Sequence, residues 1–318
     1  KLGVYQVELK TATAAAKKGE TNIASDTRSF NSGEFRVEEF RLPVLQGRIQ
    51  PADKKALVNV TAVSTDVQIS YVAGGPAMNL PVQVSALVRA KGLSFSDYDA
   101  FSFNPPQKEK KTAAGEEEAA SGQDQRVIAD KLPLRLDKNG AGKLVLDKVP
   151  ASRQAQELLL EATYADPNGE VQTIRNVAAL WPAGVIAGIK TEGWVSTSQQ
   201  IKFQALALDL TGKAIEGVSL EVKALARITT TSRKRLVGGF YTYDNKTESK
   251  DLGKICSGKS DSRGLLLCEA KLGEPGEVEL IVTAKDKDGN TVQAASSVTV
   301  TKQGEIWFGG EDHDRMDI

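Results

Sequence analysis

The two cysteines of the chain, Cys256 and Cys268, are its clearest candidates for covalent chemistry. They flank the turn sequence Ser260-Asp-Ser-Arg-Gly264, and Ser262 lies midway between them. If this turn closes a hairpin, the cysteines face each other across two antiparallel strands, where Cα atoms about 4.5–5.5 Å apart allow a disulfide. We therefore predict a cross-strand disulfide, worth about 3 kcal/mol by the loop-closure model, and an oxidising compartment. Two reduced, half-buried thiols are the alternative.

Few other residues have the types or spacing that catalysis or metal binding requires. His313 is the only histidine, and it lies in Glu311-Asp-His-Asp-Arg315 near the end of the chain, where no pocket is expected to hold a Ser-His-Asp relay. The carboxylates of this segment could ligate a hard cation, but a solvated loop is the simpler interpretation. We expect no catalytic residue, no metal and no cofactor, and hence a protein that is not an enzyme.

The composition indicates a globular chain without a strong electrostatic field. The 318 residues suggest two or three domains, and a hydrophobic fraction of 40% is enough for packed cores. Lys+Arg and Asp+Glu both number 41, which disfavours binding to nucleic acid or to an anionic membrane surface. No run of about 18 apolar residues occurs, and the first residues do not resemble a signal peptide. We expect an internal segment of a longer protein.

Alternating apolar and polar residues predict short β-strands along most of the chain. Val67 and Ile69 illustrate the pattern, as do Leu158, Leu160 and Ala162. Between such runs the motif Asp-x-x-Gly recurs, in which Asp bonds the backbone two residues on and Gly accepts a positive φ. The motif begins at Asp137, Asp166, Asp209, Asp261 and Asp286. Turn chemistry explains it better than calcium binding, because no Glu completes a calcium loop. Short strands separated by such turns predict an all-β fold of antiparallel β-sandwiches.

An internal repeat indicates two copies of one domain. Thr163-Tyr-Ala-Asp-Pro-Asn-Gly169 matches Thr283-Ala-Lys-Asp-Lys-Asp-Gly289, and the turn at Asp137 matches the turn at Asp261. The first copy is longer because of a polar insertion of low complexity at 104–127, which lacks the apolar residues needed to repay its ordering entropy. We expect this insertion to be a disordered loop.

These patterns divide the chain into four parts. We expect residues 1–40 to be the last strands of an upstream domain, 41–182 and 183–303 to be complete β-sandwiches, and 304–318 to begin another domain. Trp181-Pro182 and Trp194 bracket the second junction, where large amphipathic rings commonly seal contacts between domains. Such apolar anchors predict a stiff array.

Three motifs give the chain a resemblance to a known family. They are Gly33-Glu-Phe-Arg-Val-Glu-Glu-Phe-Arg-Leu-Pro43, the segment from Ser232 to Asn245 that contains Gly-Gly-Phe-Tyr, and Trp307-Phe-Gly-Gly310. They resemble domain junctions and a scaffold hairpin of the macroglobulin domains in the α2-macroglobulin and complement family, in particular its bacterial branch. The basic and aromatic residues of the second motif could also be read as a nucleic-acid stacking loop, but the hairpin is the better interpretation.

The resemblance implies a scaffold without the reactive group of the family. That group is a thioester between Cys and a Gln three residues later, and here Cys256 and Cys268 are followed at that spacing by Lys259 and Lys271. No thioester is therefore expected in this segment. A bait for proteases could lie around Lys108, Lys110 and Lys111, but an ordinary exposed loop is the preferred interpretation, since disordered loops are cut readily.

The resemblance implies a function in a larger protein. It predicts a structural scaffold segment of a bacterial, periplasmic, broad-range endopeptidase inhibitor, with target proteases and adjacent macroglobulin domains as partners. The parent would be a lipoprotein of the inner membrane associated with a penicillin-binding protein of cell-wall synthesis, and this segment would not touch the membrane itself. The alternative is an Ig-like adhesin or surface stalk. A β-sandwich glycosidase ranks third, because Glu38 and Glu39 lie on opposite faces of one strand.

Overall fold

The computed structural model describes residues 3–10, 29–37, 43–107, 125–193, 195–197, 200–235, 241–272 and 276–301, with the backbone alone at 195–197, 228–235 and 241–248. The described part is an all-β structure of antiparallel sandwiches, as predicted. Its one helical turn is the 3₁₀ segment η1 (Ser96–Tyr98). Among the described residues, no helix is long and apolar enough to cross a membrane.

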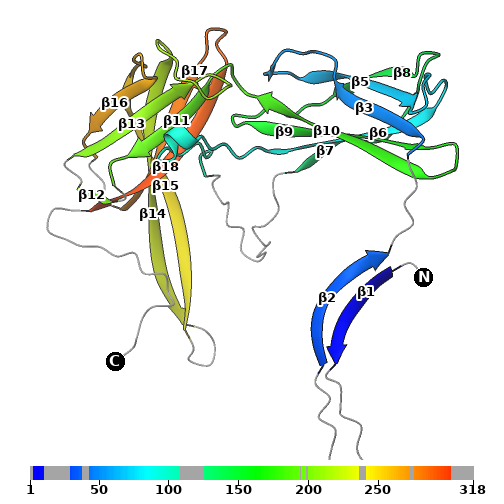
Figure 1. Cartoon of the computed structure of the whole chain (residues 1–318). Helices are drawn as coiled ribbons and strands as arrows, with labels where there is room; N and C mark the ends of the chain where they lie inside the picture. The colour runs from blue at the N-terminus through cyan, green and yellow to red at the C-terminus, as the bar shows by residue number, and fades with distance from the viewer. Residues whose placement is uncertain are drawn as a thin grey trace, which may run out of the picture.

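The first sandwich packs a three-stranded sheet against a five-stranded sheet (Figure 1). The three-stranded sheet has the order β3 (Leu45–Pro51), β5 (Ala62–Tyr71), β8 (Ala141–Asp147). The five-stranded sheet has the order β4 (Leu57–Val58), β10 (Val171–Trp181), β9 (Gln156–Ala165), β6 (Pro81–Ala90), β7 (Arg126–Arg135).

The second sandwich repeats this arrangement strand for strand. Its three-stranded sheet has the order β11 (Ile186–Thr191), β13 (Ile201–Leu208), β16 (Leu265–Ala270). Its five-stranded sheet has the order β12 (Val195–Thr197), β18 (Thr291–Thr301), β17 (Gly276–Lys285), β14 (Ser219–Arg235), β15 (Tyr241–Lys259). The identical order confirms the internal repeat. Pairing is antiparallel except at the short edge strands β4 and β12, which pair in parallel with the last strand of their sandwich.

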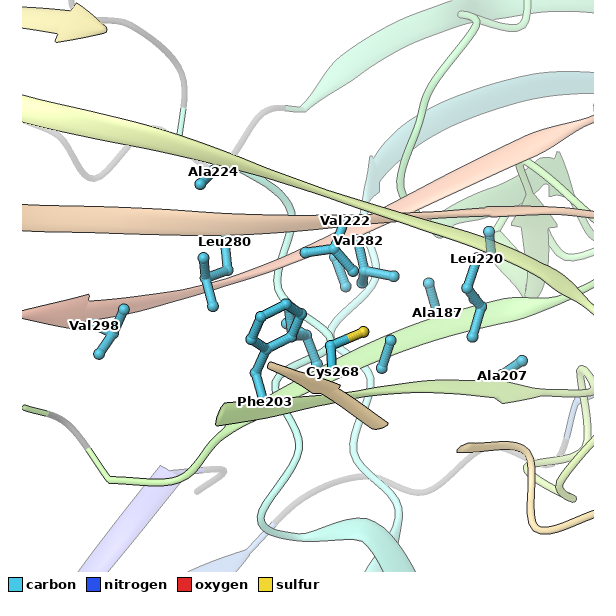
Figure 2. Packing of buried hydrophobic residues seen from close by; sticks show 14 of the residues in the cluster. Ala187, Phe203, Ala207, Leu220, Val222, Ala224, Cys268, Leu280, Val282 and Val298 are labelled. Carbon is cyan, nitrogen blue, oxygen red and sulfur yellow. The ribbon is translucent and has the colours of Figure 1, made fainter. Parts of the chain in front are cut away.

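Each sandwich has its own apolar core, formed by the inward residues of both sheets. In β9, Leu158, Leu160 and Ala162 are fully buried, as their alternation predicts. In the second sandwich Phe203 of β13 extends from the smaller sheet toward Leu280 of the larger one (Figure 2). Two separate cores mean that each sandwich can be stable by itself.

The five Asp-x-x-Gly turns share one hydrogen-bonding scheme. In each, one Asp carboxylate oxygen accepts the backbone N–H groups two and four residues on, at 2.7–2.9 Å. In each, the Gly has a φ between +69° and +90°. The turn prediction is therefore confirmed. A cation could bind this carboxylate oxygen only by displacing the backbone N–H groups of the turn itself.

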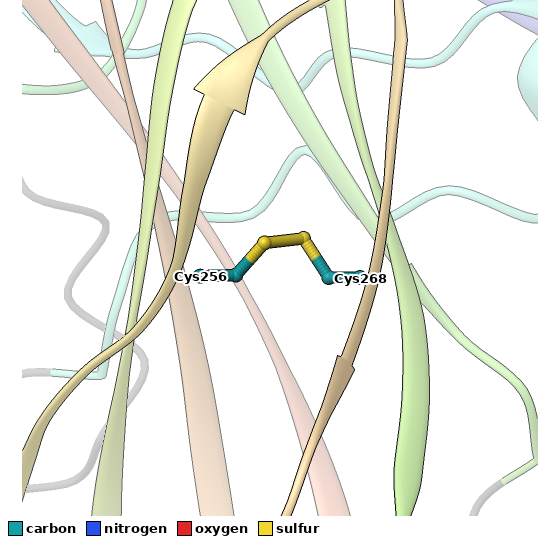
Figure 3. Close-up of a disulfide and its surroundings, with 2 residues drawn as sticks. All are labelled: Cys256 and Cys268. Carbon is teal, nitrogen blue, oxygen red and sulfur yellow. A yellow bond between two sulfur atoms is a disulfide. The ribbon is translucent and has the colours of Figure 1, made fainter.

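The structure contains the disulfide between Cys256 and Cys268, but the predicted hairpin geometry is wrong (Figure 3). Cys256 lies in β15 of the five-stranded sheet and Cys268 in β16 of the three-stranded sheet, with Cα atoms 6.2 Å apart. The turn at Asp261 joins the two sheets and does not close a hairpin within one sheet. The symmetric spacing of the cysteines around the turn is compatible with both arrangements, so it could not distinguish them. The bond therefore fastens the two layers of the second sandwich together at their edge.

The two ends of the expected loop at 104–127 lie in defined structure, contrary to the prediction. Asn104 and Gln107 contact the second sandwich, and Arg126 begins β7. Composition indicated a break in the strand pattern here but could not show where contacts resume. Residues 108–124, with Lys108, Lys110 and Lys111, lie outside the described residues.

Two ribbons complete the described structure. β1 (Gly3–Lys10) and β2 (Ser29–Val37) form a separate antiparallel pair, in which Tyr5 stacks on Phe35 with ring centroids 5.4 Å apart. β14 and β15 pair along their length, whereas β17 pairs with β14 only as far as Arg227. The two strands therefore project beyond the body of the second sandwich (Figure 1).

The turns of the first sandwich allow a direct test of this fold. A Cβ atom on Gly140 would overlap the carbonyl oxygen of Ile69, whereas a Cβ on Gly169 meets nothing within 4 Å. Both residues have positive φ, so alanine strains both by about 1–2 kcal/mol. We expect Gly140→Ala to lower the free energy of unfolding by about 1–3 kcal/mol more than Gly169→Ala, measured by urea titration. Equal losses would contradict the close approach at Gly140.

Candidate functional site

The residues with catalytic or metal-binding types do not form a site in the described part of the chain. No group of three or more His, Cys, Asp or Glu residues that could hold a metal ion occurs among the described residues. His313 and its neighbouring carboxylates lie outside the described residues, as does Trp194. The feature that brings distant residues together is instead the joint between the two sandwiches, which we treat as the candidate functional site.

The joint is formed by a segment that leaves β6 of the first sandwich and crosses the second. We call this segment, Leu93–Gln107, the strap. Its aromatic residues Phe95, Tyr98, Phe101 and Phe103 pack on an apolar cluster centred on the second sandwich, and η1 within it lies beside β11 (Figure 1). The fully buried members of this cluster are Ile186, Leu206 and Leu208.

The rings of the strap also pack against one another. Phe95 and Phe103 meet edge to face at 5.0 Å between ring centroids, and Tyr98 and Phe101 do so at 6.1 Å. Such pairs contribute about 0.5–1.5 kcal/mol each beyond the apolar area that they bury. Trp181, at the end of the first sandwich, belongs to the same cluster. The predicted apolar anchor at this junction is therefore present.

Two glycines of the second sandwich make room for these rings. A Cβ on Gly188 of β11 would lie 2.8 Å from Phe103, and a Cβ on Gly212 would lie 2.7 Å from Phe95. Gly212 is also the last residue of the Asp209 turn, with φ +90°. The strap thus fits a surface whose shape depends on the absence of two side chains.

Backbone hydrogen bonds fix the register of the strap on the second sandwich. Ser102 and Ile189 exchange both of their backbone hydrogen bonds, at 2.8 and 3.0 Å, as in a short antiparallel bridge. The Ser102 hydroxyl donates to the carbonyl of Ala295 at 2.7 Å, and the Ala295 N–H donates to the carbonyl of Asn104 at 2.7 Å. The strap is therefore held on β11 of one sheet and β18 of the other.

The end of the strap is held by a buried ion pair. Arg227 donates to the Glu279 carboxylate at 2.8 Å, and the side chains are 11% and 2% exposed. Glu279 also accepts the backbone N–H of Gln107 at 2.7 Å, and Arg227 donates to the carbonyl of Gln107 at 3.3 Å. The Glu279–Gln107 bond satisfies a carboxylate that would be costly to bury alone, so the strap and the ion pair stabilise each other.

The turn at Asp286 holds the linker between the sandwiches. Its second carboxylate oxygen accepts the N–H of Gly184 at 2.8 Å, and Asn290 accepts a hydrogen bond from the Asn59 amide of the first sandwich at 2.8 Å. Burial raises the pKa of Asp286, but the donors from Gly184, Asn290 and Asp288 outweigh this effect, so the pKa lies below its ordinary value. The ionised carboxylate is thus part of the joint.

The sequence carried a signal for the strap that strand periodicity does not detect. Four aromatic residues fall within the nine positions from Phe95 to Phe103, where apolar and polar residues alternate over only a few positions at a time. The length of the insertion and the polar residues after Gln107 suggested a loop, yet aromatic residues this dense outside a strand indicate a docking segment. The ion pair could not be foreseen, because its partners lie far apart in the sequence.

Comparisons with known proteins support the fold. No protein-family model and no curated protein matches the chain. Solved structures do match: native alpha-2-macroglobulin of E. coli at TM-score 0.56 and 15% identity, over 95% of this chain and 18% of that one. Two structures of Salmonella alpha-2-macroglobulin, a Y1175G mutant and a form reacted with methylamine, match at TM-score 0.55 with 16% and 17% identity. Each match covers 94% of this chain and 18% of the other chain.

These similarities define the class of fold to which the two sandwiches belong. At this level of identity the shared property is the macroglobulin-like fold alone. The chain spans about 18% of the length of the bacterial alpha-2-macroglobulins that it matches.

A valine at Gly188 should detach the strap. Its methyl groups would occupy the space of the Phe103 ring, and such overpacking costs about 1–3 kcal/mol. We expect Gly188→Val to raise the hydrogen-exchange rates of the Ser102, Ile189 and Ala295 amides by at least about tenfold, the equivalent of 1.4 kcal/mol. Gly92→Val is the matched control, because a Cβ on Gly92 meets nothing within 4 Å. Unchanged exchange in Gly188→Val would show that the ring moves aside freely.

The Asp286 contact should make the joint sensitive to acid. Because its folded pKa is lowered, its carboxylate stabilises the fold above the unfolded pKa of about 3.9, and this is lost as the pH falls through the folded value. Asp286→Asn should cost about 1–3 kcal/mol at neutral pH and progressively less in acid. Gly184 amide exchange should rise in this variant but not in Asp209→Asn, whose turn does not contact the linker. Equal Gly184 exchange in both variants would refute the contact.

Proposed function

We propose that this chain is a scaffold segment of a longer bacterial protein of the α2-macroglobulin type, which inhibits a broad range of endopeptidases. The observation that carries the proposal is the joint: two sandwiches of macroglobulin-like fold are fastened by the strap, the Glu279–Arg227 pair and the Asp286 turn. The segment has a mechanical role and no enzymatic one. It holds the parts of the inhibitor that meet the protease in fixed relative positions.

The mechanical role follows from the kind of contacts in the joint. Packed aromatic rings and buried hydrogen bonds have discrete arrangements, so a joint made of them stays fixed or changes as a unit. A flexible linker between the sandwiches would absorb a movement of one domain without transmitting it. In this proposal, a rearrangement elsewhere in the inhibitor reaches the next domain through the strap.

The surroundings of the parent protein belong to the proposal as well. Proteases are its targets, and neighbouring macroglobulin domains are the direct contacts of this segment. The disulfide suits the periplasm, since such bonds persist in oxidising compartments. A lipid anchor in the inner membrane and an associated penicillin-binding protein complete the proposed setting. The fold similarity favours this role over an adhesin stalk, because the three structures reported above are alpha-2-macroglobulins.

The proposal can be tested by treating the full-length protein with trypsin or elastase. We expect a compact product in small-angle scattering, and a bound protease that still cleaves small peptides but no longer digests large proteins. The same protein with Gly188→Val should lose protection of large substrates, whereas Gly92→Val should retain it. A protein that is cut without a change of shape, and leaves large substrates unprotected, is not an inhibitor of this type.

A further inference from the structure

The outer faces of the two five-stranded sheets can be compared residue by residue. Gln83 pairs with Thr163 in the first sandwich as Glu221 pairs with Thr283 in the second, which fixes the correspondence of strands. By this register, Leu159 of β9 corresponds to Glu279, and Arg89 of β6 corresponds to Arg227. The comparison matters because Glu279 and Arg227 are the residues that hold the strap.

In the second sandwich part of this face is covered by a segment of the preceding domain. The strap crosses from Ala295 on β18 to Glu279 on β17 and Arg227 on β14, through Asn104 and Gln107. Both neighbours of Glu279 in β17 are core residues, so Glu279 itself lies on the outward side of the strand. It is nevertheless only 2% exposed. An extended chain from one domain on the sheet of the next is thus the existing mode of contact in this molecule.

In the first sandwich the corresponding face carries apolar residues, two of them half-buried and two exposed. Val177, Leu159, Leu87 and Val127 form one row across four strands, because each pairs with the next in register. We call these four residues the apolar row. Val177 and Val127, at its ends, are 56% and 61% exposed, and none of the described segments covers them as the strap covers Glu279. In the second sandwich the same positions hold Ser297, Glu279, Leu225 and Asp251, so only one of the four is apolar there, and the strap satisfies the charge of Glu279.

The charged residues that flank the apolar row on the same strands are neutralised within the sheet. On one side Glu157 accepts hydrogen bonds from Arg89 at 2.8 Å and Lys91 at 3.2 Å. On the other side Arg175 contacts Glu161 at 2.7 Å. A charged partner would therefore have to break existing ion pairs, whereas an apolar chain would bury the row without doing so.

We propose that the apolar row is a docking surface for an extended, apolar segment of the domain that precedes the first sandwich in the full-length protein. This inference rests on the proposed function, in which the chain belongs to a longer array of macroglobulin-like domains. The occupant is the counterpart of the strap, and it meets Leu159 with an apolar side chain where Gln107 meets Glu279 with a peptide N–H. Arg89 stands where Arg227 binds the strap carbonyl. Each sandwich is thereby held by the one before it.

Cysteine labelling at the row tests this surface. Val177→Cys should react with a maleimide about tenfold more slowly in the full-length protein than in the 318-residue chain, equivalent to 1.4 kcal/mol of protection. The labelled peptide is identified by mass spectrometry, and Cys256 and Cys268 do not compete because they are joined in the disulfide. Val127→Cys, at the other end of the row, should behave alike. Val145→Cys is the control, since it is 60% exposed on the three-stranded sheet and should react equally in both proteins.

The outcomes separate the surface from the inhibitor. Equal labelling of Val177→Cys in both proteins would overturn the proposal, and so would protection that appears in the 318-residue chain as its concentration is raised, because a second copy would then be the occupant. The labelling is done without protease. Protection at Val177 in a full-length protein that fails to inhibit proteases would therefore uphold the surface and refute only the inhibitor.

Discussion

The structure depends on the burial of aromatic side chains from one sandwich on the surface of the next. Two β-sandwiches joined by a short linker would otherwise rotate freely, since each satisfies its own hydrogen bonds and fills its own core. The strap removes this freedom by placing Phe95 and Phe103 over glycines of the second sandwich and by continuing to the Glu279–Arg227 pair. The hydrogen bonds at Ser102 and Asp286 then specify a single arrangement out of those that the apolar contact alone would allow.

The two sandwiches share one topology but differ at the surface where the strap lies. At the positions of Leu206 and Leu208 in β13 the first sandwich has Gln68 and Ser70 in β5, by the register with β3 and β11. This part of its three-stranded sheet is therefore polar outside and could not bury such a strap. The two copies have thus retained the core pattern that defines the fold, while their outer faces have diverged in the contacts they can make.

Local chemistry in the sequence predicted much of this fold. The Asp-x-x-Gly turns, the alternation in β9 and the repeat follow from backbone and burial rules that act over a few residues. The failures have a common cause, which is that they depend on contacts between distant residues. The spacing of Cys256 and Cys268 could not show that their turn joins two sheets. Nor could composition show that Gln107, which lies within the segment expected to be a loop, is held by Glu279.

The strap is part of the connection between β6 and β7 and does not belong to the linker at Trp181–Val185. The first sandwich therefore holds the second in two ways, covalently through the linker and non-covalently through a loop that returns to its own sheet. Such an arrangement has a consequence for the inheritance of the gene. Exchange of either sandwich alone between relatives would separate the aromatic rings of the strap from the surface that accommodates them. Recombination should therefore preserve the pair of sandwiches and should break the gene outside it.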